Sequence, residues 1–344
     1  MNTAISGETL GRRLEQYLGQ HWGENVEVRD LTRIPGGASR ETYRFDAEIG
    51  GKIRGMILRR DPVDGLIDTD RQTEFMAYQS FHGSVPVPEP LVLETEGGAL
   101  ERPFFIMSRI DGGQVPSVMN LEPYGEHAGA IGRELFAILG RIARRDPATL
   151  PIKDCCTAPA LANCWREALD YWSQVIERDE RHPQPIVHAA IRRLRRNAPK
   201  PAEKISVVHG DYRSGNFMHD GRGKIMAVLD WEMAHLGDPI EDLAWCFDPL
   251  WSHFDDSRVA GTIPEAEAIA IWERESGLRV DPSVLAWWKL FSAVKGCAIW
   301  TTSAKEFVAG GNDLVLGFTG TYTARRHDRI MADLLARLVE EGWS

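Results

Sequence analysis

The chain has 344 residues, of which 43% are hydrophobic and 26% are charged, and its formal net charge is −10. This composition is typical of a globular protein long enough for two lobes with real cores. A negative net charge without a dense run of lysine and arginine argues against nucleic acid or an anionic membrane as the main partner. The five cysteines lack a Cys-x-x-Cys spacing, so we expect neither a disulfide framework nor a zinc site.

The sequence also lacks the patterns expected of a secreted or membrane-spanning chain. Residues 1–18 include four charged side chains and have no apolar signal core. The apolar stretch 285–300 is interrupted by Lys289 and Lys295, so it does not read as a bilayer span. We therefore expect a cytoplasmic protein, and the pattern makes no prediction of its oligomeric state.

The first third of the chain has the pattern of a β-rich lobe with one helix. Residues 31–45 pass through a Gly-Gly pair into an alternating strand, and residues 52–60 read as the strand that follows. A glycine pair lets backbone N–H groups approach a phosphate closely, although most such pairs are plain hairpin turns. Alternation places Arg59 and Arg60 on opposite faces of the second strand.

A helix and a further strand complete this lobe. Residues 69–81 have helical apolar spacing, with Glu74 near the start. Three prolines between 86 and 90 then break the chain, and the apolar segment 103–110 reads as a strand that runs into a second Gly-Gly pair. We interpret the end of this strand as a hinge, so that residues 1–110 form one lobe and residues 111–344 form the other.

From residue 121 onward, helical periodicity dominates, and strands are expected only between 209 and 230. The expected helices are 124–145, 163–177, 185–196, 264–276, 282–309 and 319–341. Asp238-Pro-Ile-Glu241 additionally offers an N-cap, a proline at the first helical position and a glutamate at the third. The sequence therefore predicts an α+β architecture, with the active site in the cleft between a small lobe and a large, mainly helical lobe.

One segment, His209-Gly-Asp-Tyr-Arg-Ser-Gly-Asn216, is followed by a hairpin pattern. Asp220-Gly221 lies between two apolar runs and is a turn signal, and the second run ends at Asp230. Because a hairpin brings its two ends together, we expect Asn216 and Asp230 to meet, with Asp211 close by. Two carboxylates and an amide oxygen suit Mg²⁺, which usually takes one or two carboxylates together with substrate phosphates.

The whole stretch from His209 to Trp245 resembles the aminoglycoside phosphotransferase and choline kinase family. Its second half, Leu229-Asp-Trp-Glu-Met-Ala-His-Leu-Gly-Asp-Pro-Ile-Glu-Asp-Leu-Ala-Trp245, resembles the branch of that family linked to acyl-CoA dehydrogenases. The resemblance implies a protein kinase-like two-lobed fold. It also implies an ATP- and Mg²⁺-dependent transfer of the γ-phosphoryl group to the hydroxyl of a small molecule.

The same resemblance implies roles for individual residues. Asp211 would be the catalytic base, and Asn216 and Asp230 would be the metal ligands. His209, Glu232 and Asp242 would support the loop, although Glu232 could instead reach a second metal ion. Arg59 would pair with Glu74, and the hinge would contact adenine. The full set of residues expected to bind the nucleotide is Gly36, Gly37, Ser39, Arg59, Glu74, Met107 and Ile110. The glycine loop departs from the pattern Gly-x-Gly-x-x-Gly. The sequence therefore does not decide which of its residues contacts phosphate.

The identity of the phosphoryl acceptor also stays open. Most of the tryptophans in the second half are expected in the core, but one or two could line an acyl or aromatic pocket; the set comprises Trp245, Trp251, Trp287, Trp288 and Trp300. Three aspartates around Trp251, at 248, 255 and 256, could instead receive an ammonium group, as in kinases of choline or aminoglycosides. The resemblance to the acyl-CoA-dehydrogenase-linked branch favours a hydroxyacyl compound.

Two other functions fit part of the pattern. A nucleotide-binding module without transfer activity would not require Asp211, Asn216 and Asp230 together. A metal-dependent hydrolase could be built from His209, Asp211, Asp230 and His235. The glycine loop and the expected Arg59–Glu74 pair would then be unexplained.

Overall fold

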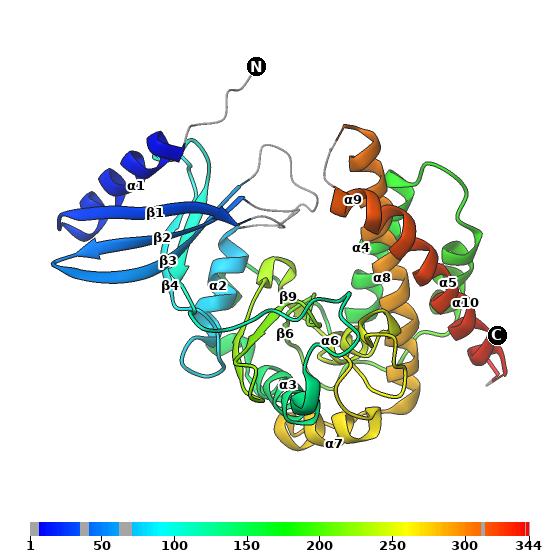
Figure 1. The fold of residues 1–344 in the computed structure, drawn as a ribbon. Coiled ribbons are helices and arrows are strands. Elements are labelled where there is room, and N and C mark those ends of the chain that lie inside the picture. The colour runs from blue at the N-terminus through cyan, green and yellow to red at the C-terminus, as the bar shows by residue number, and fades with distance from the viewer. Residues whose placement is uncertain (1–6, 35–40, 62–70, 311–313, 341, 344) are drawn as a thin grey trace.

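A five-stranded antiparallel sheet forms the N-terminal lobe of the computed structural model, which describes residues 7–34, 41–61, 71–310, 314–340 and 342–343 (Figure 1). The strands lie in the order β1-β2-β3-β5-β4. Their bounds are β1 (Val26–Ile34), β2 (Glu41–Ile49), β3 (Lys52–Arg60), β4 (Pro90–Glu94) and β5 (Phe104–Ser108). The expected strand at 52–60 is confirmed with the same ends.

Helices cover both faces of this sheet. α1 (Gly7–Trp22) packs on one face through Leu10, Leu14 and Leu18, which recur every four residues and are buried against the sheet. α2 (Arg71–Phe81) packs on the other face, where its Phe75 ring lies 6.0 Å from that of Phe105. The lobe therefore contains two helices, whereas the sequence analysis predicted one. A stripe of only three leucines is sufficient to pack α1 on the sheet.

The strand β4 was also missed by the sequence analysis, which interpreted the prolines around it as a break. β4 begins at Pro90 and forms the edge of the sheet, paired with β5 alone. A proline lacks the N–H needed for a ladder hydrogen bond, so it is tolerated at the first residue of an edge strand. The prolines therefore delimit this strand rather than exclude it.

The C-terminal lobe is mainly helical (Figure 1). Its helices are α3 (Ala128–Arg144), α4 (Cys164–Asp179), α5 (Pro185–Arg196), α6 (Ile240–Cys246), α7 (Glu265–Ser276), α8 (Pro282–Val308), α9 (Leu314–Phe318) and α10 (Ala324–Glu340), and single 3-10 turns include η4 (Trp231–Met233) and η5 (Pro249–Trp251). α8 is buried along most of its length and contacts α4, α5, α6 and α10. The expected small β-rich lobe beside a large helical lobe is confirmed, and none of the described helices is long and apolar enough to cross a lipid bilayer.

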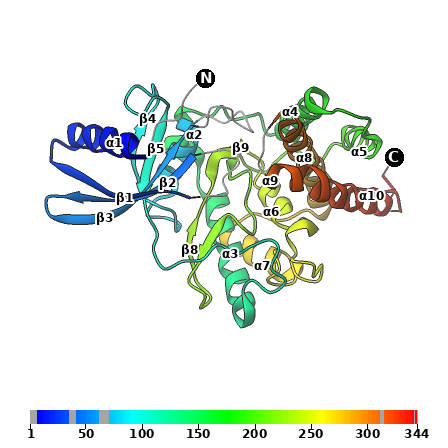
Figure 2. The ribbon, with the colours of Figure 1, turned by 45° about the horizontal axis from the view of Figure 1, so that its top comes forward.

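Short strands of the C-terminal lobe lie on the side that faces the N-terminal sheet (Figure 2). β7 (Phe217–His219) and β8 (Ile225–Val228) form the expected antiparallel hairpin, whose turn is held by the Asp220 carboxylate accepting from the N–H groups of Arg222 and Lys224. β6 (Ser206–Val208) pairs with β9 (His235–Gly237), which the sequence analysis did not predict. The two pairs together fix both ends of the segment 209–234.

The final expected helix, 319–341, is π-helical in its first turn, and a short helix, α9, precedes it. A π-helical turn (Thr319–Thr323) separates α9 from α10. A Cβ on Gly317 or Gly320 would overlap Phe307 or Ala304 of α8, so both glycines permit a close approach of the two segments. A π-helical turn contains one more residue than an α-helical turn, and the spacing of apolar residues does not reveal it. The sequence analysis therefore predicted one continuous helix.

Candidate active site

The loop after β6 is held by a carboxylate from α6. Asp242 accepts hydrogen bonds from the backbone N–H groups of His209 and Gly210, at 2.6 and 2.9 Å. Gly210 has a φ of 82°, and a Cβ there would overlap the carbonyl oxygen of Met233, so this turn requires glycine. Burial and the neighbouring Glu241 raise the pKa of Asp242 to about 6, although both N–H donors favour its charged form.

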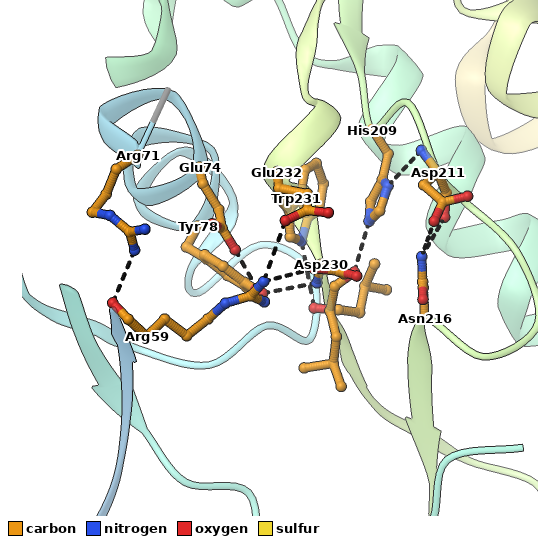
Figure 3. A network of polar contacts seen from close by, with 12 residues as sticks. Arg59, Arg71, Glu74, Tyr78, His209, Asp211, Asn216, Asp230, Trp231 and Glu232 are labelled. Atoms are coloured by element: carbon orange, nitrogen blue, oxygen red, sulfur yellow. Dashed lines mark hydrogen bonds and ion pairs between the residues drawn. The ribbon is translucent and has the colours of Figure 1, made fainter. Parts of the chain in front are cut away.

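His209 is fully buried and links this loop to the end of the hairpin. Its Nδ1 accepts from the N–H of Asp211 at 3.1 Å, so the proton lies on Nε2, which donates to the carbonyl of Leu229 at 2.9 Å (Figure 3). Burial lowers the pKa of His209 to about 4, which keeps the ring neutral near pH 7. The histidine therefore positions Asp211 and Leu229-Asp230 relative to each other.

The Asp211 carboxylate has three hydrogen-bond donors. Its Oδ1 accepts from Nε of Arg213 at 2.9 Å and from the indole N–H of Trp245 at 2.8 Å. Its Oδ2 accepts from Nδ2 of Asn216 at 2.6 Å (Figure 3). These contacts fix the orientation of a side chain that lines a cavity and stays 15% exposed.

Asp230 lies directly after the hairpin, in a left-handed conformation with φ of 64° and ψ of 56°. Its N–H donates to the hydroxyl of Tyr78 in α2 at 2.9 Å, and its Oδ1 accepts from Nη2 of Arg59 at 2.8 Å. Burial alone would raise the pKa of Asp230, but the attraction of Arg59 outweighs it and lowers the pKa. The carboxylate is therefore ionised at neutral pH.

Arg59 is shared between the two lobes. Nη1 lies 3.1 Å from Oε1 of Glu74 in α2, and Nη2 lies 2.8 Å from Asp230 and 3.6 Å from Oε2 of Glu232 (Figure 3). Glu74 is fully buried, and Arg60 points to the opposite face, where it pairs with Glu41. One guanidinium thus faces three carboxylates at the base of the cleft.

Two oxygen atoms in this cluster are suited to a cation. Arg59 contacts Oδ1 of Asp230, and Asn216 uses its Nδ2 as a donor. No described residue donates a hydrogen bond to the remaining oxygens, Oδ2 of Asp230 and Oδ1 of Asn216. An amide oxygen and a carboxylate oxygen are ligands that Mg²⁺ accepts, with phosphates and water completing its shell. The residues present therefore fit Mg²⁺.

Two adjoining cavities meet at this cluster. The first, of about 710 Å³, lies between the sheet and the hairpin and is lined in part by Ile57, Met107, Ile110, Met218 and Leu229. The second, of about 860 Å³, extends into the helical lobe and contains Asp211, Asn216 and Asp230. Arg59 and Leu229 line both cavities, so the cluster stands at their junction.

The structure brings together most of the residues singled out in the sequence. Asp211, Asn216 and Asp230 converge as the hairpin pattern predicted, and Arg59 and Glu74 form the expected ion pair. Met107 and Ile110 line the first cavity, and no hydrogen bond from a described residue reaches the backbone of Ile110. The predicted phosphate-contacting residues Gly36, Gly37 and Ser39 lie outside the described residues.

Three contributors were missed, and two of them had a readable signal. Arg213 is two residues from Asp211 in the same loop, and Tyr78 is four residues from Glu74, hence on the same face of α2. Trp245 was weighed mainly as a core residue, and the indole contact with Asp211 could not be read from a tryptophan in an apolar helix.

The two rival interpretations each depend on residues that lie outside this site. His235 contacts Glu241 and lines a separate cavity of about 350 Å³, so it does not join His209, Asp211 and Asp230. The three aspartates around Trp251 do not line the second cavity. Asp248 accepts from the buried His327, Asp255 pairs with Arg258, and Asp256 accepts from Ser252.

Residues 30–278 match the model of the phosphotransferase enzyme family. Acyl-CoA dehydrogenase family member 10 of Mus musculus is 27% identical over 248 residues, which cover 70% of this chain and 22% of that protein. The chain thus spans less than a quarter of the length of this relative.

Solved structures share the fold. A candidate aminoglycoside phosphotransferase from Ralstonia eutropha has a TM-score of 0.75 at 21% identity, covering 95% of this chain and 98% of that one. A mutant of the aminoglycoside phosphotransferase APH(4)-Ia, in a complex with ADP and hygromycin B, has a TM-score of 0.60 at 18% identity, covering 93% and 98%. The expected protein kinase-like two-lobed fold is confirmed. Because the family model covers well over half of the sequence, the chain belongs to the phosphotransferase enzyme family.

Proposed function

We propose that the protein is an ATP- and Mg²⁺-dependent kinase that transfers the γ-phosphoryl group to a hydroxyl of a small molecule. The observation that carries this proposal is the convergence of Asp211, Asn216 and Asp230 at the junction of two cavities. A nucleotide in the first cavity and an acceptor in the second would present their reacting atoms to each other there. Phosphoryl transfer depends mainly on positioning and charge neutralisation, which such a junction supplies.

In this proposal the first cavity holds ATP. The apolar side chains of Ile57, Met107 and Leu229 would enclose adenine, and the backbone of Ile110 would offer hydrogen bonds to its edge. Gly36, Gly37 and Ser39 would contact the phosphates, since they join the strands whose ends, at Ile34 and Thr42, line both cavities. ADP in the APH(4)-Ia complex supports a nucleotide in this fold.

At the junction, each residue has a distinct task. Asp230 and Asn216 would hold Mg²⁺, which supplies charge neutralisation for the phosphates when bound. Arg59, positioned by Glu74, would bind phosphate oxygens. Asp211, oriented by its three donors, would accept the hydrogen bond of the acceptor hydroxyl and take its proton as the new P–O bond forms, while the bond from the γ-phosphorus to the β,γ-bridging oxygen breaks and ADP leaves.

The second cavity favours an acyl compound over a polycation. Apart from Asp211, Asp230 and Glu232 at the junction, no acidic side chain lines it among the described residues. Its walls include Leu250, Trp251, Phe254, Ile299, Trp300, Leu316 and Phe318. We therefore propose a hydroxyacyl compound as the acceptor, which the similarity to an acyl-CoA dehydrogenase family member supports. An aminoglycoside- or choline-type acceptor is the alternative, favoured by the hygromycin B complex.

A phosphate-transfer screen with labelled ATP and Mg²⁺ tests the proposal. The acceptors are hydroxyacyl-CoAs, free hydroxy acids, amino alcohols and aminoglycosides. We expect transfer to a hydroxylated acyl compound. The rate should fall about 10²–10⁴-fold in Asp211→Asn and be retained in Asp154→Asn, a matched change at an exposed aspartate outside both cavities. Transfer confined to amine-bearing acceptors, with a Michaelis constant that rises steeply with salt, would favour the alternative. No transfer to any acceptor, with nucleotide binding intact, would favour a binding module.

A further inference from the structure

Arg326 differs from the other arginines of the second cavity in its partners. It lies in the first turns of α10, donates from Nη2 to the carbonyl of Pro249 at 3.1 Å, and is half-buried. Its guanidinium carbon lies 4.3 Å from the centroid of the Phe254 ring. No carboxylate of the described residues forms an ion pair with it. Four of its five N–H donors therefore have no partner there.

The other two arginines that line this cavity are already paired with carboxylates. Arg213 pairs with Asp211, and Arg59 pairs with Asp230 and approaches Glu232. Arg326 is thus the positive charge that stands away from the reacting groups, in a wall that is otherwise largely apolar. An arginine held by a carbonyl and an aromatic face has a fixed fork of donors, and low local polarity strengthens its attraction for an anion.

The 3-10 turn η5 sets the position of Arg326 relative to the catalytic loop. The Arg213 guanidinium, bonded to Asp211, lies 4.5 Å from the centroid of the Trp251 ring at one end of this turn. Arg326 is bound to Pro249 at its other end. An acceptor with its hydroxyl at Asp211 and an anionic group at Arg326 would therefore extend across Trp251 along an apolar wall.

We propose that Arg326 binds the anionic group of the acyl acceptor and so selects anionic over neutral and cationic compounds. The anion would be either the carboxylate of a free acid or a phosphate of an acyl carrier such as CoA. This proposal rests on the proposed function for the identity of the site, but it concerns binding and can be read without transfer. A charged hydrogen bond of this kind corresponds to a preference of roughly tenfold to hundredfold in affinity.

Calorimetric binding of octanoate, octanoyl-CoA and octanamide to the full chain tests the proposal. None of these probes has a hydroxyl on its acyl chain, so a failure of phosphoryl transfer cannot affect the result. We expect octanoate, octanoyl-CoA or both to bind at least tenfold more tightly than octanamide, and the probe that does so identifies the source of the anion. The preference should disappear in Arg326→Gln and persist in Arg325→Gln, an exposed neighbour outside the cavity.

The controls separate a lost anion site from a lost fold. Melting temperature and Mg-ATP binding should be unchanged in Arg326→Gln, and Arg326→Lys should keep part of the preference, because it keeps the charge but not the fork. Should Arg326→Gln fail to fold, the proposal is decided by the affinities of the wild type for the three probes and by the preference that Arg326→Lys keeps. Equal affinity for all three probes, no binding of any probe, or a preference that survives in Arg326→Gln would each overturn the proposal.

Discussion

Replacing Arg59 by methionine should destabilise the protein strongly, because the change removes the guanidinium that faces three carboxylates. The Arg59 side chain is 10% exposed and that of Glu74 is fully buried. Removing one partner of a buried ion pair costs about 3–5 kcal/mol, since the other charge stays desolvated. Asp230 and Glu232 lose the same guanidinium, so we place the effect in the upper part of that range.

Urea denaturation provides the measurement, with the free energy of unfolding taken from the midpoint and slope. In the double variant Arg59→Met with Glu74→Leu, at least about 2 kcal/mol of the loss should return, because the most deeply buried charge is removed as well. Additive losses in the double variant, or a loss below about 1 kcal/mol in Arg59→Met, would refute the electrostatic explanation.

A second measurement separates the site from burial in general. Millimolar Mg²⁺ should stabilise Arg59→Met more than the wild type, because a cation bound only by the folded state contributes by mass action. Arg60→Met is the matched control, since Arg60 is also buried and paired with a carboxylate, Glu41, but on the other face of β3. Equal responses to Mg²⁺ in the two variants would contradict a metal site at Asp230.

Three further predictions follow from the site. Asp230→Ala should lose Mg²⁺-dependent nucleotide binding, whereas Asp211→Asn should keep it in a titration and lose about 10²–10⁴-fold in rate; similar affinities and rates in both variants would contradict these roles. His209 has a pKa of about 4 when folded and 6.5 when unfolded, so the unfolded chain takes up its proton first, and up to about 3 kcal/mol of stability should be lost as the pH falls from 6.5 to 4. His209→Gln should show a flatter pH profile of unfolding free energy, and parallel profiles would refute this. His327→Phe, which breaks the hydrogen bond from the indole of Trp300, should raise the Michaelis constant of the acceptor about tenfold while that of ATP stays unchanged; an equal rise for both would show a general loss of structure.

The hairpin and its flanking residues could be predicted because their determinants are local. The turn at Asp220-Gly221 and the apolar runs on either side define the hairpin, and the hairpin alone brings Asn216 to Asp230. Asp238 accepts from the N–H of Ile240 just before α6, but the N-cap residue is Pro239, one position later than the sequence predicted. Strand alternation separated Arg59 from Arg60, but assigning Arg59 to the site required the family resemblance.

The acceptor side could not be predicted in the same way, because it is assembled from distant segments. Its walls combine the loop at 115–119, the turn η5, the C-terminal half of α8 and residues 315–326. A π-helical turn decides which side chains of the last segment face the cavity, and Arg326 is one arginine among several in an amphipathic helix. The sequence indicated tryptophans near an acceptor, yet Trp287 and Trp288 are core residues whereas Trp251 and Trp300 line the cavity.

The buried residues of the expected lobe 1–110 divide between two cores. One face of its sheet forms a core with α1, but Phe75, Tyr78, Phe81 and Phe105 belong to the core of the helical lobe. Phe81 stacks on Trp231, at 4.9 Å between ring centroids. Burying such a side chain contributes about 1.5–3 kcal/mol, so the four together contribute on the order of 6–12 kcal/mol, comparable to the whole stability of a domain. Because α2 carries three of these rings as well as Glu74, the contacts that fold the two lobes together also place Arg59 beside Asp230.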